Sequence, residues 1–106
     1  MKLGIILETK EAEKSWNAFR FAIAALKKGN SVKMFLLGEA VECENIEDKE
    51  HDTPTLMKEY KANGGEILAC GTCIKARHLE DTTSCPISTM NDCVDIVEWS
   101  DKMVTF

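Results

Sequence analysis

Apolar residues along this chain fall into two kinds of run, and the two kinds alternate. Short runs of consecutive apolar residues are typical of strands that are covered on both faces of a parallel sheet. The predicted strands are 2–7, 32–37, 66–69 and 102–106. Between them, apolar residues three or four positions apart predict amphipathic helices. The predicted helices are 11–28, 54–62, 74–79 and the segment after residue 88.

The alternation of strands and helices predicts the fold class. Strands joined through a helix imply right-handed crossovers and parallel pairing. We therefore expect one α/β domain over residues 1–106. Its three layers would be a mainly parallel sheet of four or five strands with helices on both faces. A further strand in the polar segment 79–86 would be very short.

Local signals add detail to the helices. Thr9, Thr53 and either Ser88 or Thr89 precede helical segments and are predicted N-caps. In the last helix, four side chains at helical spacing are expected to share the buried face. They are Met90, Cys93, Val94 and Val97.

Charge is distributed unevenly along the chain. The formal net charge is −5, which argues against a nucleic-acid partner because such a partner requires a basic face. Seven carboxylates and one lysine lie between Glu39 and Asp52. We expect this segment to be a solvated acidic loop.

Cysteine usage bears on the compartment. No apolar run is long enough for a signal-peptide core or a membrane span, so we expect a cytoplasmic protein with no membrane partner. The chain has five cysteines, an odd number that would leave one thiol unpaired. In a reducing cytoplasm these thiols are expected to be core residues, ligands or reagents instead of a disulfide framework.

The segment Cys70-Gly71-Thr72-Cys73 is the strongest chemical signal. It follows the apolar run 67–69, so both thiols are expected where a strand ends and a helix begins. Sites of open α/β sheets cluster at such junctions, and a helix N-terminus favours a thiolate. Basic residues at 75, 77 and 78 add positive charge. We expect Cys70 to be the better nucleophile and Cys73 its resolving or assisting partner.

The other candidate side chains carry less weight. Cys93 is expected in the core. Cys43 in the acidic segment and Cys85 before Pro86 could approach the same sheet edge as Cys70, with nearby carboxylates raising the pKa of Cys43. His51 and His78 lie in polar stretches, which is typical of solvated side chains.

Three chemistries suit a pair of thiols at this spacing. A zinc or iron–sulfur site needs further ligands, and the remaining cysteines form no second CxxC. A thioredoxin-like oxidoreductase has a strand–CxxC–helix arrangement, but here the motif follows the third strand and Ala69 precedes it where thioredoxins have tryptophan. The third possibility is persulfide carriage, in which a cysteine holds a sulfane sulfur and passes it to an acceptor thiol.

The stretch from Ile67 to Arg77 (ILACGTCIKAR) resembles the DsrE family of small sulfur-relay proteins, which includes TusD and YchN-like members. The resemblance extends over the opening strand, the long first helix and the segment 34–38 (MFLLG). It implies a DsrE-like fold, with the sulfur-accepting cysteine at Cys70. Cys73 corresponds to a second cysteine of the YchN-like branch. The family usually has glycine after the arginine, where this chain has His78.

The resemblance also implies a function and partners. We expect a sulfurtransferase-type carrier without metal or cofactor that accepts persulfide sulfur on Cys70, assisted by Cys73. Its partners would be sulfur donor and acceptor proteins, and the chain itself would form homotrimers or homohexamers. The alternatives are a CxxC thiol–disulfide oxidoreductase and a non-catalytic oligomeric binding homologue.

Overall fold

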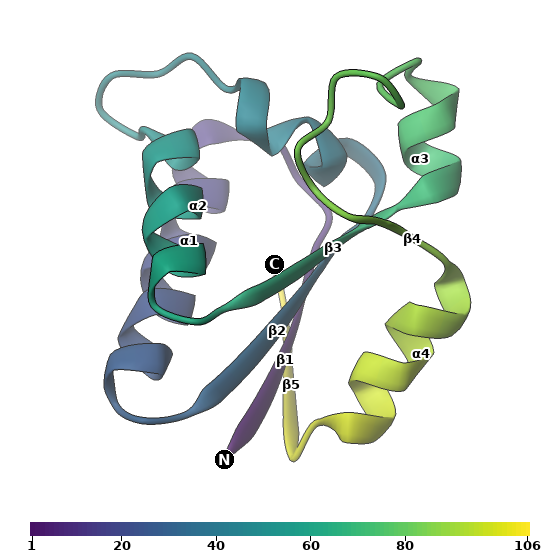
Figure 1. Cartoon of the computed structure of the whole chain (residues 1–106). Helices are drawn as coiled ribbons and strands as arrows, with labels where there is room; N and C mark the ends of the chain where they lie inside the picture. Colours follow the sequence, from purple (N-terminus) through teal and green to yellow (C-terminus); the bar gives the residue numbers. More distant parts are fainter.

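The computed structural model describes residues 1–106 and contains one five-stranded sheet in which every strand pair is parallel (Figure 1). The strand order is β4-β3-β2-β1-β5. In chain order the elements are β1 (Lys2–Leu7), α1 (Ala12–Lys27), β2 (Ser31–Leu36), the 3-10 helix η1 (Gly38–Asn45), α2 (Thr53–Ala62), β3 (Glu66–Cys70), α3 (Gly71–Ala76), β4 (Ile87–Ser88), α4 (Met90–Trp99) and β5 (Lys102–Thr105). The predicted α/β fold is confirmed.

Helices cover both faces of the sheet, as the alternation of elements predicts. Figure 1 shows α1 and α2 against one face and α4 against the other, with α3 beside the carboxyl ends of the strands. Gly4 permits the close approach of α4, because a Cβ there would overlap Ser100 and Met103 and lie 3.2 Å from Ile96 Cγ2. The sheet is therefore the central layer of three.

The core lies mainly between the sheet and the helices α1 and α2. Phe19 of α1 and Tyr60 of α2 meet edge to face, with ring centroids 5.6 Å apart. The Tyr60 hydroxyl donates to the carbonyl of Glu66 at 2.6 Å and lies 3.3 Å from that of Val32. Burial raises the pKa of Tyr60. The phenol thus joins α2 to two strands while its ring fills the core.

Several helix boundaries differ from the predicted ones. The acidic segment is not simply a loop, because its first part forms η1. The helix after the cysteine pair begins at Gly71, three residues before the predicted start. The predicted N-caps Thr9 and Thr53 are wrong, because the N-caps of α1 and α2 are Glu11 and Asp52. Thr9 Oγ1 instead accepts a hydrogen bond from the Glu11 N–H at 3.0 Å. The predicted cap of the last helix at Thr89 is confirmed.

The predicted buried face of the last helix is wrong in part. Cys93 is buried together with Ile96, but Met90, Val94 and Val97 are 54%, 50% and 44% exposed. The helix packs against the sheet through Cys93 and Ile96. Met90, Val94 and Val97 follow one another at positions i, i+4 and i+7 on the neighbouring stripe, and they therefore face outward. Periodicity alone cannot separate these two neighbouring stripes.

None of the helices combines the length and the apolar composition that a membrane span requires.

Candidate active site

The Cys70-Gly71 step connects β3 to α3 at the carboxyl edge of the sheet. Cys70 is the last residue of β3 and the N-cap of α3, and it pairs with Ser88 of β4. Gly71 is required sterically, since a Cβ there would lie 2.9 Å from the Ser88 carbonyl oxygen and 3.1 Å from Ile87 Cγ2. The glycine of the motif therefore lets β4 pack directly behind the first cysteine.

Cys73 lies in the first turn of α3, where η1 reaches it. The backbone N–H of Gly38, the first residue of η1, donates to Cys73 Sγ at 3.2 Å. The pKa of Cys73 is raised, chiefly by burial and next by the hydrogen bond to Cys70. The Gly38 N–H and the Arg77 guanidinium act in the opposite direction. Cys73 therefore holds its proton more firmly than an ordinary thiol.

The two cysteines differ in accessibility. Cys70, which is expected to be the better nucleophile, is only 4% exposed. It pairs with Ser88 of β4. Burial raises the pKa of Cys93 of α4, and the nearby Cys70 adds a smaller contribution. Cys73 is only half-buried. Cys73 is therefore the more accessible of the two thiols.

Arg77 is the one basic residue of the motif that is engaged at the site. Its Nε donates to Glu42 Oε2 at 3.1 Å, and its Nη1 donates to the Cys73 carbonyl at 3.2 Å. Lys10 Nζ lies 3.3 Å from the same Glu42 oxygen. Lys75 is exposed and makes no ion pair. Sequence reasoning missed Glu42, because it sits among carboxylates expected to be solvated.

Cys43 and Cys85 lie apart from the dithiol. Both are buried, and Cys43 Sγ donates to the Thr9 carbonyl at 3.4 Å. Burial raises the pKa of Cys43 to about 11, with smaller contributions from Cys85 and Glu42. The pKa of Cys85 is also raised, first by burial. The carboxylate contribution expected for Cys43 is present, but desolvation dominates it.

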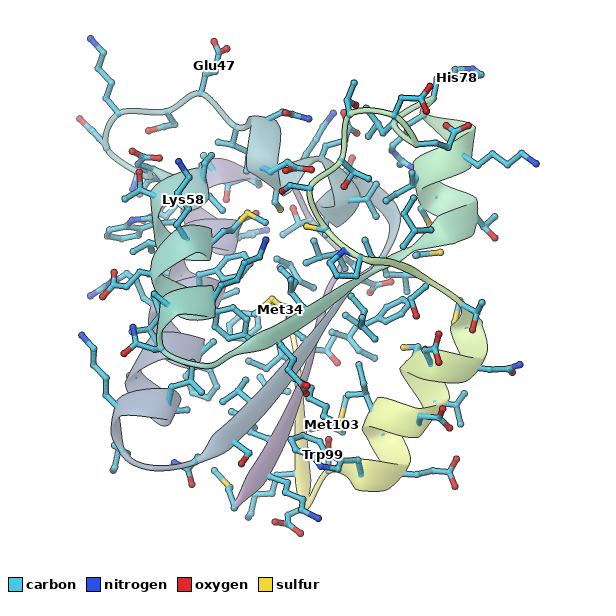
Figure 2. The ribbon with its side chains drawn as sticks, in the orientation of Figure 1. Met34, Glu47, Lys58, His78, Trp99 and Met103 are labelled. Carbon is cyan, nitrogen blue, oxygen red and sulfur yellow. The ribbon has the colours of Figure 1, made fainter.

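The two histidines are placed away from the sulfurs. His51 stands against the Trp16 ring, with centroids 5.1 Å apart, and its Nδ1 lies 3.6 Å from Asp48. His78 is exposed at the end of α3, and Figure 2 shows its side chain pointing outward. Its φ of 55° lies in the left-handed region, which is unfavourable for residues other than glycine.

No group of three or more histidine, cysteine, aspartate or glutamate side chains is arranged so as to hold a metal ion. The site as built consists of two cysteines at the β3–α3 junction, a backbone N–H that donates to Cys73, and an arginine held by a carboxylate.

The fold and the dithiol define a small α/β protein with a thiol site at the carboxyl edge of a parallel sheet. The chain matches the DsrE/DsrF-like family over residues 1–106 and belongs to it. It is 34% identical over 100 residues to the uncharacterized protein MJ0989 of Methanocaldococcus jannaschii, covering 89% of this chain and 88% of that protein. The uncharacterized protein MK0008 of Methanopyrus kandleri is 33% identical over 100 residues, covering 89% and 83%.

A solved structure supports the fold. The conserved protein of unknown function BT1422 from Bacteroides thetaiotaomicron superposes with a TM-score of 0.81, covering 99% of this chain and 94% of that one. Its sequence identity is 17%, so the similarity concerns the fold. The family match over residues 1–106 confirms the resemblance noted in the sequence.

Proposed function

We propose that this protein is a sulfur carrier that accepts persulfide sulfur on Cys70 and passes it on with the help of Cys73. The observation that carries the proposal is the placement of both cysteines where β3 ends and α3 begins, in a chain of the DsrE/DsrF-like family. Exchange between thiols and persulfides needs a reducing compartment, and we propose the cytoplasm.

Loading is a sulfane-sulfur transfer that needs no added oxidant. The Cys70 thiolate attacks the outer sulfur of a donor protein's persulfide, a new S–S bond forms, and the donor cysteine leaves as its thiolate. Because Cys70 is 4% exposed, its side chain or β4 must move for the donor to reach it. Cys73 is more accessible and can donate a hydrogen bond to the negatively charged sulfur.

Release follows one of two balanced routes. An acceptor thiolate can attack the outer sulfur, which restores the Cys70 thiolate and leaves the persulfide on the acceptor. Alternatively, the Cys73 thiolate attacks the inner sulfur of the Cys70 persulfide and expels hydrosulfide as a Cys70–Cys73 disulfide forms. The second route consumes two electrons from a thiol reductant when the disulfide is reset.

Mass spectrometry after incubation with a persulfide donor tests the proposal. The reduced protein should gain about 32 Da per sulfur, on Cys70 in the peptide map. Cys70→Ser should abolish loading, whereas Cys73→Ser should still load but release sulfur more slowly or without a disulfide. Cys43→Ser is the matched control, since this buried thiol lies outside the dithiol and should leave loading unchanged. Absence of added sulfur on both Cys70 and Cys73 would refute sulfur carriage.

A second candidate function is thiol–disulfide exchange. Two cysteines at this junction also suit a dithiol that cycles between reduced and oxidised forms. Insulin reduction with a dithiol cosubstrate distinguishes the two functions. Turnover that requires both cysteines, without sulfur loading, favours the oxidoreductase. An inert dithiol that neither loads nor turns over favours a non-catalytic binding homologue.

We further propose that the chain assembles into homotrimers or homohexamers. The exposed flank of α4 supports this, because Met90, Val94 and Val97 form an apolar stripe that no other part of the chain covers. Light scattering on the purified protein measures the assembly. Val94→Lys should dissociate it, whereas Glu80→Lys, at an exposed position outside α4, should not. A monomeric wild-type protein would refute the proposal.

A further inference from the structure

The outer edge of the sheet is largely open along β3. β4 is two residues long and pairs with β3 only at Ala69 and Cys70. No strand lies opposite 66–68, the first part of β3. The Ala69 N–H donates outward to the Pro86 carbonyl at 2.9 Å. Because backbone groups alternate in direction along a strand, the N–H and C=O of Ile67 face the same open edge.

A groove of about 620 Å³ runs along this open edge. Figure 1 shows β3 at the edge of the sheet between α2 and α4. On one side the groove is lined by Asp92, Asp95 and Ile96 of α4, and on the other by Lys61 of α2 with Ser84 and Pro86. The two sides of the groove therefore correspond to the two faces of the sheet.

The charges on the two sides differ. Asp95 is exposed and makes no ion pair, and Asp92 accepts hydrogen bonds from Ser88 and Thr89 yet keeps its negative charge. On the other side, Lys61 is exposed and makes no ion pair, and the Glu44 carboxylate accepts hydrogen bonds from Ser84. Glu66 is already paired with Lys33, at 3.6 Å. The α4 side is thus anionic, whereas the α2 side carries the Lys61 ammonium near the Glu44 carboxylate.

We propose that this groove binds an extended segment of a partner protein, which adds as a strand to the Glu66–Leu68 edge. Side chains of a strand alternate between the two faces of the sheet. A residue opposite Ile67 would face Lys61, and its two neighbours would face the α4 carboxylates. The segment therefore carries basic side chains on either side of an apolar or acidic one, and its backbone pairs with Ile67.

Binding at this edge is separate from the sulfur chemistry. The open stretch of three residues spans roughly 10 Å, which suits a short segment of three to five residues. It is continuous with the strand that carries Cys70, so a partner bound there lies beside the dithiol. Cys70→Ser should leave the groove intact, so peptide binding can be measured whether or not sulfur transfer takes place.

The probe is the peptide Ac-Val-Lys-Val-Lys-Val-NH2, titrated into ¹⁵N-labelled full-length protein at low ionic strength. We expect amide shifts over 65–68 and slower hydrogen exchange at the Ile67 N–H. The charge-reversed peptide Ac-Val-Glu-Val-Glu-Val-NH2 should bind more weakly. Asp95→Lys should weaken binding of the basic peptide about fivefold, because attraction is replaced by repulsion. Glu98→Lys, with the same charge change on α4 outside the groove, is the matched control.

Three results would overturn the proposal. The first is the absence of shifts over 65–68 at millimolar peptide. The second is equal binding of both peptides, or an equal loss of binding in Asp95→Lys and Glu98→Lys. Either result would show that charge complementarity between the groove and the peptide does not contribute to binding. The third is shifts confined to α4 without protection of the Ile67 amide, which would indicate a surface charge contact and not an added strand.

Discussion

Alkaline pH should destabilise this protein through Cys43, and Cys43→Ser should remove that part of the pH dependence. Cys43 is fully buried in η1, where its thiol donates to the Thr9 carbonyl. A serine hydroxyl can make the same hydrogen bond but does not ionise below pH 12. The two chains therefore differ mainly in one titrating group.

The sign and size follow from the pKa of Cys43. Burial raises it from 9.0 to about 11, so the unfolded chain loses this proton at lower pH than the folded one. The stabilisation is fully present below pH 9 and is lost as the pH rises toward 11. At pH 10 the loss amounts to about 1.4 kcal/mol, because the thiol of the unfolded chain is then deprotonated by about ten to one while that of the folded chain stays mostly protonated. Tyr60 and Cys85 titrate in both chains and largely cancel in the comparison.

Urea unfolding at pH 7.5 and pH 10, under reducing conditions, measures the effect. The wild-type free energy of unfolding should fall by about 1.4 kcal/mol more than that of Cys43→Ser. Ser15→Ala is a control without a titrating group; it removes a hydrogen bond that lowers the pKa of Cys43, so its pH dependence should equal or exceed that of the wild type. Parallel losses in wild type and Cys43→Ser would show that this thiol ionises freely in the folded state, and the reasoning would fail.

Three further predictions concern stability at neutral pH. His78→Gly should raise the free energy of unfolding by about 1 kcal/mol in urea titrations, because glycine adopts a φ of 55° without the strain that other residues carry there. His78→Ala should give no such gain. Gly65→Ala should lower the free energy of unfolding by about 2 kcal/mol, since the new Cβ would overlap the Tyr60 ring. Thermal melts measure this loss, and an unchanged melting temperature would contradict the contact. Glu42→Gln should lower the free energy of unfolding by about 0.5–1 kcal/mol, because it removes the ion pair with Arg77. The loss should be smaller in 1 M salt, and a loss that does not depend on salt would argue against the ion pair.

The strands were the most predictable elements. Each long strand is a run of consecutive apolar residues, and burial on both faces is what such a run requires in a parallel sheet. The position of the cysteine pair after 67–69 was predictable for the same reason. β4 was not, since a two-residue strand carries no pattern and forms only because the chain passes beside Ala69 and Cys70.

The helix faces and the acidic segment were less predictable. Two apolar stripes lie side by side on α4, and only packing against the sheet decides that Cys93 and Ile96 are the buried ones. Glu42 looks like a solvated carboxylate in the sequence, yet it pairs with Arg77 across 35 positions of the chain. Contacts of that separation depend on where two elements meet, which local spacing does not record.

Hydrophobic periodicity and motif spacing are local properties of the chain, and they were sufficient to predict the α/β class, the order of the main strands and helices, and the junction that carries Cys70 and Cys73. The burial of Cys70, the partial exposure of Cys73 and the hydrogen bond from Gly38 to Cys73 could not be predicted in this way. Accessibility, desolvation and hydrogen bonding between distant segments arise from packing. The same packing raises the pKa of Cys73 and leaves the edge of β3 open.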